Sequence, residues 1–554
     1  MARVSGATRR RFLKHSACTG LALGIWPGAL LAQEPASGKL DPGFQPDVEL
    51  LMTARPAAIG ILPGRQTEVL RYEVSLVQGP ADTVTEAGTY LAPTLRLRKG
   101  QRVRVRFRNE LPSQDQIVHW HGLHVPESAD GHPRDAVGPG GTYVYEFEVL
   151  NRAGTYFYHA HTNMLTGPQV YRGLAGLLLV SDEDERALGL PAGAEDVPIV
   201  IQDRRFDADN QLVYLQHHME SQLGFLGDRI FVNGRPDFVL PVETRPYRLR
   251  LVNMSNSRIY KLAWKDGTPL TAIGTDGGLL AEPVQRPYLI LAPAERVDIW
   301  ADFRGRTLGS ELAMISLPVS AGLPHMMMRH MGGMGGPGMM GHGGMGMGKG
   351  PEDVGPNTEL EEESPAGAKD DLAEGFTVFR VRIERSAQAG ANELPTRLAP
   401  FPHYRPEDAA NSGDTRVIEL SFRHDQGFLN GRSFEMTGAA PEERIPIDSL
   451  QIIEFVNPPG HGHGMMAALP HPMHIHGQQF QILRRESFPA YDEDHAALAA
   501  GFIDEGLKDT VLVLPGQRVT LLKRFDKFPG LVLYHCHNLE HEDRDMMRNF
   551  LVFA

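Results

Sequence analysis

Alternation of hydrophobic and polar residues dominates the chain from about residue 45 onward. It is clearest at 102–107 (RVRVRF) and 247–251 (YRLRL). A period of two puts every second side chain on the same face of a β-strand, and frequent glycines and prolines separate short strands. The pattern predicts an all-β protein of sandwiches or barrels with few helices.

Two short signatures recur three times in the same order. One is a strand that ends in asparagine, found at 104–109, 248–253 and 452–457. The other is a turn that leads into a strand, found at 139–147, 292–303 and 515–525. Three ordered pairs are a poor match to chance and indicate repeated units. We therefore predict three related β-domains at residues 45–182, 195–318 and 373–554.

The chain has 554 residues, of which 42% are hydrophobic and 22% charged. This length exceeds one ordinary core and fits several domains. Between the second and third predicted domains, residues 319–372 begin rich in Met, Gly and His and end acidic and Pro-rich. Such a composition cannot form a packed core and predicts a mobile segment.

The N-terminus has the composition of an export signal. A basic run at 8–14 (TRRRFLK) precedes a short apolar stretch at 17–31, with a small-residue cleavage site near Ala32. This resembles a twin-arginine signal. We therefore expect residues 1–33 to be removed and the mature protein to be periplasmic. No apolar run reaches the length of a membrane span, so we expect no membrane insertion after removal.

Removal of the signal changes the charge and the cysteine count. Residues 1–33 carry five basic side chains and no acid, so the formal charge falls from −13 to −18. An acidic surface argues against nucleic acid as a partner and mildly favours cationic partners. Cys18 leaves with the signal, and Cys536 becomes the single cysteine of the mature chain. A single cysteine cannot form a disulfide within the chain, and an unpaired thiol is a liability in an oxidising compartment unless it has another function.

The candidate chemistry lies in four His-x-His pairs. They are His119/His121, His159/His161, His474/His476 and His535/His537. On a strand, residues two apart share a face about 6.6 Å from each other. Each pair can therefore serve two neighbouring metal ions. The pairs occur in the first and third domains, whereas the corresponding segment 258–264 of the middle domain has no histidine. The cluster is predicted between domains one and three, with the middle domain as a spacer.

The segments 158–161 (YHAH) and 534–537 (YHCH) differ at one position. Cys536 stands where the first domain has Ala160, and on a strand its thiol faces away from the flanking imidazoles. It can thus bind a separate metal close to the cluster. One Cys, two His and a distant Met form the ligand set of a blue copper site. The candidate partners of Cys536 are His471, His541 and Met546.

These motifs resemble the multicopper oxidases across nearly the whole mature chain. The matching segments are 119–122 (HWHG), 159–162 (HAHT), 471–477 (HPMHIHG) and 535–547 (HCHNLEHEDRDMM). The resemblance implies three consecutive cupredoxin-like Greek-key domains. The last segment, the export signal and the Met-rich insert are most similar to the periplasmic copper-efflux oxidases, also called cuprous oxidases.

The family resemblance implies four copper ions and their ligands. A type 1 copper would be held by His471, Cys536 and His541, with Met546 axial. A type 2 copper would be held by His119 and His474. The two type 3 ions would be held by His121, His159 and His537, and by His161, His476 and His535.

The resemblance also implies a reaction. An external donor gives single electrons at the type 1 copper, and dioxygen is reduced to water after four have arrived. Four protons are needed as well, so carboxylates near the cluster are expected. Asp130 and Glu542 stand where the family keeps its proton-relay acids.

Methionines suggest the donor. Nine of them, with three histidines, fall within 325–347, and a second group, His461 to Met466, precedes His471. Thioethers prefer Cu(I), so we expect cuprous copper as donor and a role in copper detoxification. One departure matters: the copper-efflux oxidases have Asp and Met where this chain has Ala467 and Leu469. The substrate site therefore cannot be transferred by residue.

Two alternatives stay open. One is a laccase-like oxidase of phenols or aromatic amines, with the Met-rich segment as a copper trap or lid. The other is a copper-binding or division-associated scaffold of the same fold without turnover. We expect a monomer. Seven further histidines show no interpretable spacing and predict surface or satisfied polar roles: His124, His132, His217, His218, His403, His424 and His495.

Overall fold

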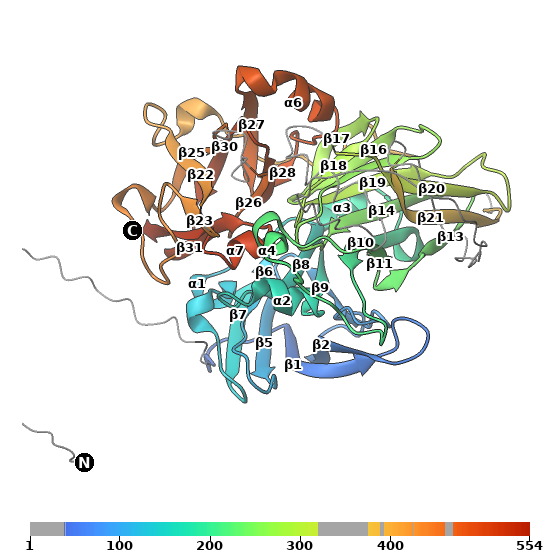
Figure 1. The fold of residues 1–554 in the computed structure, drawn as a ribbon, viewed down its shortest axis with the longest axis horizontal. Coiled ribbons are helices and arrows are strands. Elements are labelled where there is room, and N and C mark those ends of the chain that lie inside the picture. The colour runs from blue at the N-terminus through green and yellow to red at the C-terminus, as the bar shows by residue number, and fades with distance from the viewer. Residues whose placement is uncertain (1–37, 39, 320–374, 388–392, 424, 460–468) are drawn as a thin grey trace, which may run out of the picture. The chain divides into compact units, whose positions relative to one another are not determined.

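The computed structural model describes residues 38, 40–319, 375–387, 393–423, 425–459 and 469–554. The predicted signal peptide, the Met-rich run 325–347 and the second Met/His group at 461–466 lie outside these ranges. The described residues form six β-sheets joined by loops and short helices (Figure 1). None of their helices has the length and apolar character needed to span a membrane.

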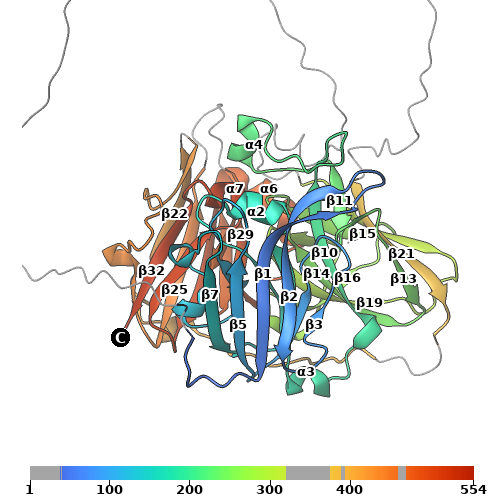
Figure 2. The ribbon, with the colours of Figure 1, turned by 90° about the horizontal axis from the view of Figure 1, so that it is seen from below.

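The first sandwich packs the sheet β2-β1-β5-β7 against the sheet β3-β4-β9-β8-β6. Figure 2 shows β1, β2, β5 and β7 side by side. The strands are β1 (Val48–Ile59), β2 (Thr67–Gln78), β3 (Val84–Thr85), β4 (Thr94–Arg98), β5 (Arg102–Asn109), β6 (Val118–His121), β7 (Thr142–Glu148), β8 (Gly154–Ala160) and β9 (Ala175–Ser181). Alternate side chains of both sheets fill one core, as the period-two pattern predicts.

The second sandwich packs the sheet β12-β11-β10-β14-β19-β16-β17 against the sheet β13-β21-β20-β15-β18. Its strands are β10 (Asp196–Arg204), β11 (Arg229–Val232), β12 (Arg235–Pro236), β13 (Val239–Glu243), β14 (Pro246–Asn253), β15 (Tyr260–Trp264), β16 (Leu270–Thr275), β17 (Gly278–Arg286), β18 (Leu289–Leu291), β19 (Arg296–Asp302), β20 (Glu311–Ser316) and β21 (Phe376–Arg385). A second hydrophobic core lies between these two sheets.

The third sandwich packs the sheet β23-β22-β25-β30-β27-β28 against the sheet β24-β32-β31-β26-β29. Its strands are β22 (Arg416–Arg423), β23 (Gln426–Leu429), β24 (Arg444–Pro446), β25 (Ser449–Asn457), β26 (His471–Ile475), β27 (Phe480–Ser487), β28 (Leu507–Lys508), β29 (Thr510–Val513), β30 (Gln517–Phe525), β31 (Gly530–Cys536) and β32 (Met547–Phe553). Its core contains Cys536 and Met546.

Short helices occupy the loops between strands. They are α1 (Glu127–Asp130), α2 (Thr166–Tyr171), α3 (Glu183–Ala187), α4 (His218–Leu223), α6 (Asp492–Ala499) and α7 (Leu539–Glu542). Helix α7 of the third sandwich contacts both α2 and α4, so loops from all three sandwiches meet there. The predominance of strands confirms the predicted all-β fold.

The two sequence signatures correspond to the same pair of strands in each sandwich. The strand that ends in asparagine is β5, β14 or β25, and it pairs antiparallel with β7, β19 or β30. Each also lies parallel to the first strand of its sheet group, β1, β10 or β22. The asparagine amides Asn109, Asn253 and Asn457 each donate to two backbone carbonyls, which lie in loops or at the ends of strands. This cross-bracing of loops explains why the strand ends in asparagine three times.

The predicted boundary at residue 373 is wrong. Strand β21, which falls within the range predicted for the third domain, pairs with β13 and β20 in the second sandwich. Residues 398 and 399 also pack in the second core. The segment 319–372 is therefore an insertion between two paired strands of the second domain. The third domain begins after the last residues that pack in the second core, 398 and 399.

Candidate metal centre

The four predicted histidine pairs lie on, or end one residue after, four strands that pair within their own domains. His119 of β6 is opposite His159 of β8, and His474 of β26 is opposite His535 of β31. The residues that alternate with them, such as Trp120 and Cys536, belong to the core of their own sandwich. The pleat thus sends the imidazoles outward, toward the other domain. These strands are buried on both faces because the two domains meet over their histidines.

All eight imidazoles form one cluster, which we call the histidine cluster. His119 stacks on His476, and His121 stacks on His474, each with ring centroids 3.8 Å apart. Each stack joins the first domain to the third. The eight side chains are at most 5% exposed. The structure thereby brings together all four pairs that the sequence singled out, between the two domains predicted.

Three groups of ring nitrogens within this cluster lie within 4.8 Å of one another. They are His119/His121/His474, His121/His159/His537 and His161/His476/His535. The second and third groups are the two sets that the family resemblance implies for the type 3 ions. The first contains the two residues implied for the type 2 ion. The assignment of each set to its own copper stays a prediction.

The unpaired nitrogens test whether a metal would fit. Nε2 of His119, His159 and His474 is buried and lacks a hydrogen-bond partner among the described residues. The other nitrogen of each ring, Nδ1, donates to a backbone carbonyl 2.7–2.8 Å away. Because Nδ1 carries the proton, Nε2 presents a lone pair, which is costly to bury unless something binds it. Converging lone pairs of this kind fit bound metal ions.

Burial keeps these imidazoles neutral. Desolvation lowers the pKa of His159, His161 and His474 well below its usual range, and that of His476 to about 3. A neutral imidazole is the form that binds a metal ion, so no protons need to leave these rings at neutral pH.

Cys536 faces away from the histidine cluster and forms a second group with His471 and His541, which we call the cysteine site. Nδ1 of His471 is 3.4 Å from Cys536 Sγ, Nδ1 of His541 is 3.7 Å from it, and the two nitrogens are 3.3 Å apart. Burial raises the pKa of the Cys536 thiol. A thiolate here therefore requires a bound cation, which the triangle of donors suits.

Met546 is hydrogen-bonded through its backbone to two residues of the cysteine site. Its backbone carbonyl accepts a hydrogen bond from Cys536 N at 3.0 Å, and its amide donates to the carbonyl of His541 at 3.1 Å. The side chain is fully buried in the same core as Cys536. Its role as an axial ligand stays a prediction.

Asp130 connects the cluster to a loop of the first domain. Its carboxylate accepts a hydrogen bond from His476 Nδ1 at 2.7 Å, and Oδ1 lies 3.4 Å from His119 Nδ1. Burial alone would raise the pKa of Asp130, but the adjacent His476, which donates to its carboxylate, and the nearby His119 hold it below its usual value. The next residue, Gly131, has φ 82° and presses against Val118 O, where a Cβ would stand 2.0 Å away. This close approach fixes the loop that carries Asp130.

Glu542 of α7 lies beside two other histidines of the cluster. Its carboxylate oxygens are buried 3.1 Å from His535 Nδ1 and 3.7 Å from His161 Nε2, in geometry that makes no hydrogen bond. A buried carboxylate aimed at the cluster without a fixed partner is suited to hold or pass a proton.

Asp509 and Arg296 belong to the site but were not predicted. Asp509 Oδ1 lies 3.1 Å from His121 Nε2, and its backbone carbonyl accepts from His474 Nδ1. Arg296 at the start of β19 clamps both Asp509 oxygens at 2.6 Å. Arg296 also donates to Thr155 O in the first domain. No spacing in the sequence marks either residue.

The middle domain is therefore more than a spacer. Next to Arg296, its Asp276 and Glu295 both bind Lys508 of the third domain, with Nζ–O distances of 3.1 Å. All these charged groups are at most 4% exposed by side chain. The second domain thus supplies ionic contacts that fix Asp509, and through it His121 and His474, in place.

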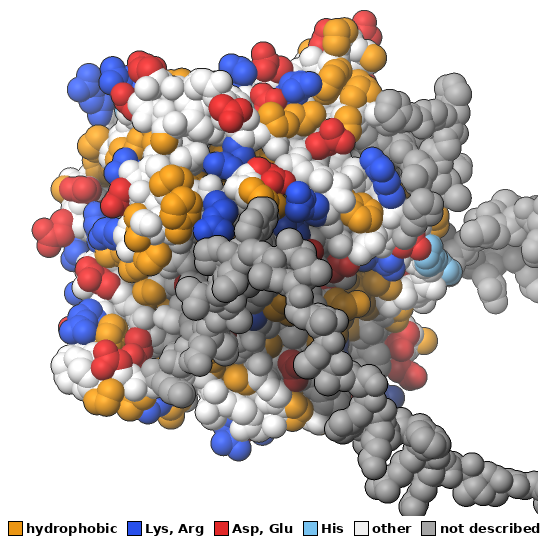
Figure 3. Space-filling view, turned by 90° about the vertical axis from the view of Figure 1, so that its left-hand side faces the viewer, with side chains coloured by type: hydrophobic (Ala, Val, Ile, Leu, Met, Phe, Trp, Pro, Cys, Tyr) orange, Lys and Arg blue, Asp and Glu red, His pale blue; other side chains and the backbone are white. Residues whose placement is uncertain are grey.

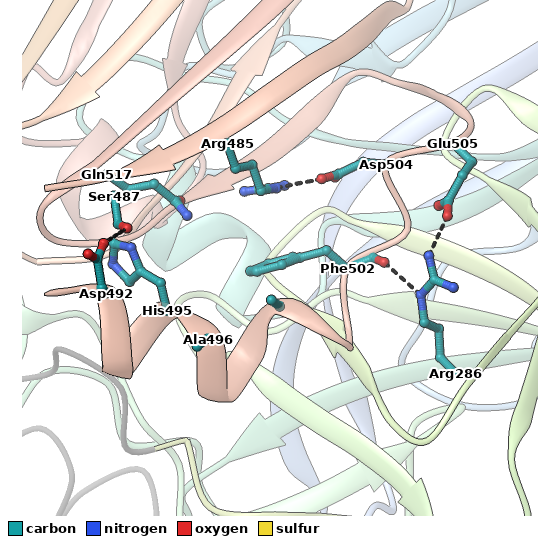
Figure 4. A pocket seen from close by; sticks show the side chains of 11 residues that line it. Arg286, Arg485, Ser487, Asp492, His495, Ala496, Phe502, Asp504, Glu505 and Gln517 are labelled. Carbon is teal, nitrogen blue, oxygen red and sulfur yellow. Dashed lines mark hydrogen bonds and ion pairs between the residues drawn. The ribbon is translucent and has the colours of Figure 1, made fainter. Parts of the chain in front are cut away.

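A separate surface pocket lies between α6, β27 and β17 (Figure 4). Its arginines have acidic partners: Arg485 pairs with Asp504 at 2.7 Å, and Arg286 pairs with Glu505. None of the predicted copper ligands lines it. The pocket's charges are satisfied internally, and it is distinct from the metal centre.

Known proteins resemble this chain over most of its length. Two sequence models described as multicopper oxidase match residues 68–185 and 416–554, the regions that carry all the predicted ligands. A laccase of Bacillus stratosphericus is 29% identical, covering 85% of this chain and 90% of that protein. The cell division protein FtsP of Xenorhabdus nematophila is 40% identical over 39% of this chain and 45% of its own length. Among solved structures, the McoA multicopper oxidase of Aquifex aeolicus is 30% identical with a TM-score of 0.70, covering 92% and 97% of the two chains.

Proposed function

Because this chain belongs to the multicopper oxidases, copper enzymes that use dioxygen as acceptor, we propose that cuprous copper is its physiological donor. The enzyme would then oxidise Cu(I) to Cu(II) and so limit cuprous toxicity. One observation carries this choice: nine methionines, the soft donors that Cu(I) prefers, fall within residues 325–347. The family implies four copper ions, and the donor groups described above fit them.

The bound copper ions would supply the one-electron chemistry that side chains lack. His471, Cys536, His541 and Met546 would hold one ion, and the eight histidines would hold the other three. Cys536 belongs to the cysteine site, whereas His535 and His537 on either side of it belong to the histidine cluster. The two centres are thus joined by adjacent residues of one chain segment, a short covalent path for electrons.

Carboxylates on two sides of the cluster would manage the protons. Asp130 stays ionised because His476 donates to it, so it can orient that imidazole beside the cluster. Glu542 faces His161 and His535 without a fixed hydrogen bond. We propose Glu542 as the group that delivers protons when dioxygen is reduced to water.

Oxygen uptake by copper-loaded protein tests the donor. We expect faster uptake with a Cu(I) complex than with a simple phenol at equal concentration. Deletion of residues 325–347 should lower the rate with Cu(I) more than the rate with the phenol. If the deletion leaves Cu(I) oxidation intact, the methionine argument fails. If only the phenol is oxidised, the donor proposal fails.

A laccase-like oxidation of phenols is the second candidate. The laccase relative described above favours it, as does Leu469, a buried apolar residue where the copper-efflux oxidases have a substrate-binding Met. FtsP supports the scaffold alternative only weakly, because it matches less than half of this chain and every predicted ligand is retained here.

We also propose that the protein is exported by the twin-arginine pathway and works as a monomer. The basic run at 8–14 supports export, and the histidine cluster is complete within one chain. Replacement of Arg9 and Arg10 by Lys should leave the protein in the cytoplasm, as cell fractionation would measure.

Light scattering after size-exclusion chromatography should give the mass of one chain; a dimer mass would refute the monomer.

A further inference from the structure

Helix α4 of the second domain covers the predicted copper ligand His541. His541 Nε2 donates to the backbone carbonyl of Gln222 at 2.8 Å. Its other nitrogen, Nδ1, faces Cys536 in the cysteine site. Gln222 therefore connects the cysteine site to the surface that helix α4 forms.

The side chain of Gln222 leads one step further, to Asp425. Gln222 Nε2 donates to Asp425 Oδ1 in the loop between β22 and β23. Arg544, three residues after His541, fixes the same corner: it donates to Asp425 O at 2.9 Å and to Ser221 Oγ at 2.8 Å. Two independent contacts, from Gln222 and from Arg544, thereby hold Asp425 in place.

The second oxygen of Asp425 binds His218 at the start of α4. His218 Nε2 lies 2.7 Å from Asp425 Oδ2, and the His218 side chain is 65% exposed. Histidine side chains are visible at one edge of the face in Figure 3. A carboxylate that accepts from one ring nitrogen fixes the tautomer and leaves the other nitrogen as a metal donor, the arrangement common among metal-binding histidines. Nδ1 of His218 makes no hydrogen bond within the described part of the chain.

We propose that His218, oriented by Asp425, is the docking site for the cuprous ion that this enzyme oxidises. Imidazole is a suitable ligand for copper, and a single donor suits an ion that must arrive and leave. The nearby carboxylate favours a cation over a neutral phenol. The contacts His218–Asp425, Asp425–Gln222 and Gln222–His541 join the docked ion to the cysteine site through three residues.

This inference rests on the proposed donor, and its stoichiometry is simple. Each docked Cu(I) loses one electron and departs as Cu(II). Four such oxidations, with four protons, convert one dioxygen molecule into two waters. Dioxygen is the acceptor that the family's activity already supplies.

The test compares His218→Ala with His403→Ala in the full copper-loaded chain. His403 is also exposed, but its ring lies tilted against Phe401 with the centroids 4.7 Å apart, and it takes no part in these contacts. We expect H218A to lower kcat/KM for a Cu(I) complex about ten-fold, equivalent to ~1.4 kcal/mol, relative to its own rate with a phenol. D425N should lower it less, and H403A should match the wild type.

A second measurement does not depend on turnover. Ag(I) resembles Cu(I) but is not oxidised, so its binding can be followed by equilibrium dialysis. H218A should retain less Ag(I) than H403A. Equal Ag(I) binding and an equal Cu(I)-to-phenol ratio in the two variants would overturn the site. Wild-type protein that oxidises only phenol would instead overturn the donor, while the Ag(I) comparison would still decide whether His218 binds the ion.

Discussion

Strands β8 and β31 occupy equivalent places in the first and third domains. Both direct histidines to the histidine cluster, but only β31 carries a metal-binding side chain, Cys536, on its core face. In both, a histidine Nδ1 hydrogen-bonds the carbonyl of the next residue, Ala160 in β8 and Cys536 in β31. In both, the amide of that residue donates to the residue that precedes the neighbouring strand, Leu174 or Met546. The backbones are therefore matched.

The difference lies on the core side of each strand. Three residues before the first histidine pair of each domain, the first domain has Gln116 and the third has His471. Four residues after the second pair, the first domain has Leu165 and the third has His541. Gln116 donates to Tyr72 OH within an ordinary core. The histidine face is thus common to both domains, whereas the cysteine site depends on three residues that only the third domain carries: His471, Cys536 and His541.

Cys536→Ala makes β31 resemble β8 and should have the largest effect. Oxygen consumption with any donor should fall to background, because the cysteine site loses its thiolate and the covalent path to the histidines. The blue absorbance should vanish, and bound copper should fall from four ions to three per chain. Retained turnover with a phenol would show that electrons reach the cluster without this strand.

Glu542→Gln should come next. Loss of a general acid typically costs ~10²–10⁴-fold in rate, so kcat should fall by at least about a hundred-fold with the blue absorbance preserved. The matched control is Glu540→Gln, since Glu540 is saturated by Tyr214, Asn256, Ser257 and the amide of Phe225. Equal losses in kcat for the two variants would refute a proton role for Glu542.

Arg296→Met tests the contribution of the middle domain. Removing one partner of a buried ion pair costs ~3–5 kcal/mol, and Asp509 would be left uncompensated beside His121. We expect a lower melting temperature for the copper-free protein and less copper in the histidine cluster, with the cysteine site filled. Arg296→Lys keeps the charge and should lose less. An unchanged copper content in R296M would show that the middle domain acts only as a spacer between the other two domains.

The double substitution His471→Gln and His541→Leu copies the first domain and should change acid stability. Burial lowers the pKa of His471, and that of His541 to about 4, so the folded copper-free protein leaves them neutral while the unfolded chain protonates them below about 6.5. Stability therefore falls as pH drops from about 6.5 toward 4, by ~1.4 kcal/mol per pH unit for each histidine. The copper-free double variant should lose less stability than the wild type over this range. Parallel curves in pH-dependent denaturation would contradict this.

Ala160→Cys should have the smallest effect. It gives β8 the thiol of β31 without the histidines, so we expect no additional blue absorbance and a stability change below about 1.5 kcal/mol. A new blue band would mean that a thiol alone is sufficient on this backbone.

Local spacing was enough to predict the strands, the repeats and the ligand candidates. His-x-His pairs on alternating strands must project to one side, and Cys536 between two histidines must project to the other, so the two centres follow from the pleat. Contacts between segments far apart in the chain were not predictable in this way. Asp509 and Arg296 are 213 positions apart, and Gln222 lies 319 positions from His541. The boundary at 373 failed for the same reason, since the partner of β21 was separated from it by a long insertion.

That insertion has a consequence for how the protein can change. Ser316 and Phe376 are direct partners in the register of β20 and β21, so both ends of the inserted segment are fixed by one sheet. By the general relation for closing a chain between two fixed ends, doubling the length of a connection costs only ~0.6 kcal/mol. The insertion's methionine content and length can therefore drift or be exchanged while the copper ligands keep their geometry. The proposed capture of cuprous copper and the reduction of oxygen would in this sense be separately evolvable modules of one chain.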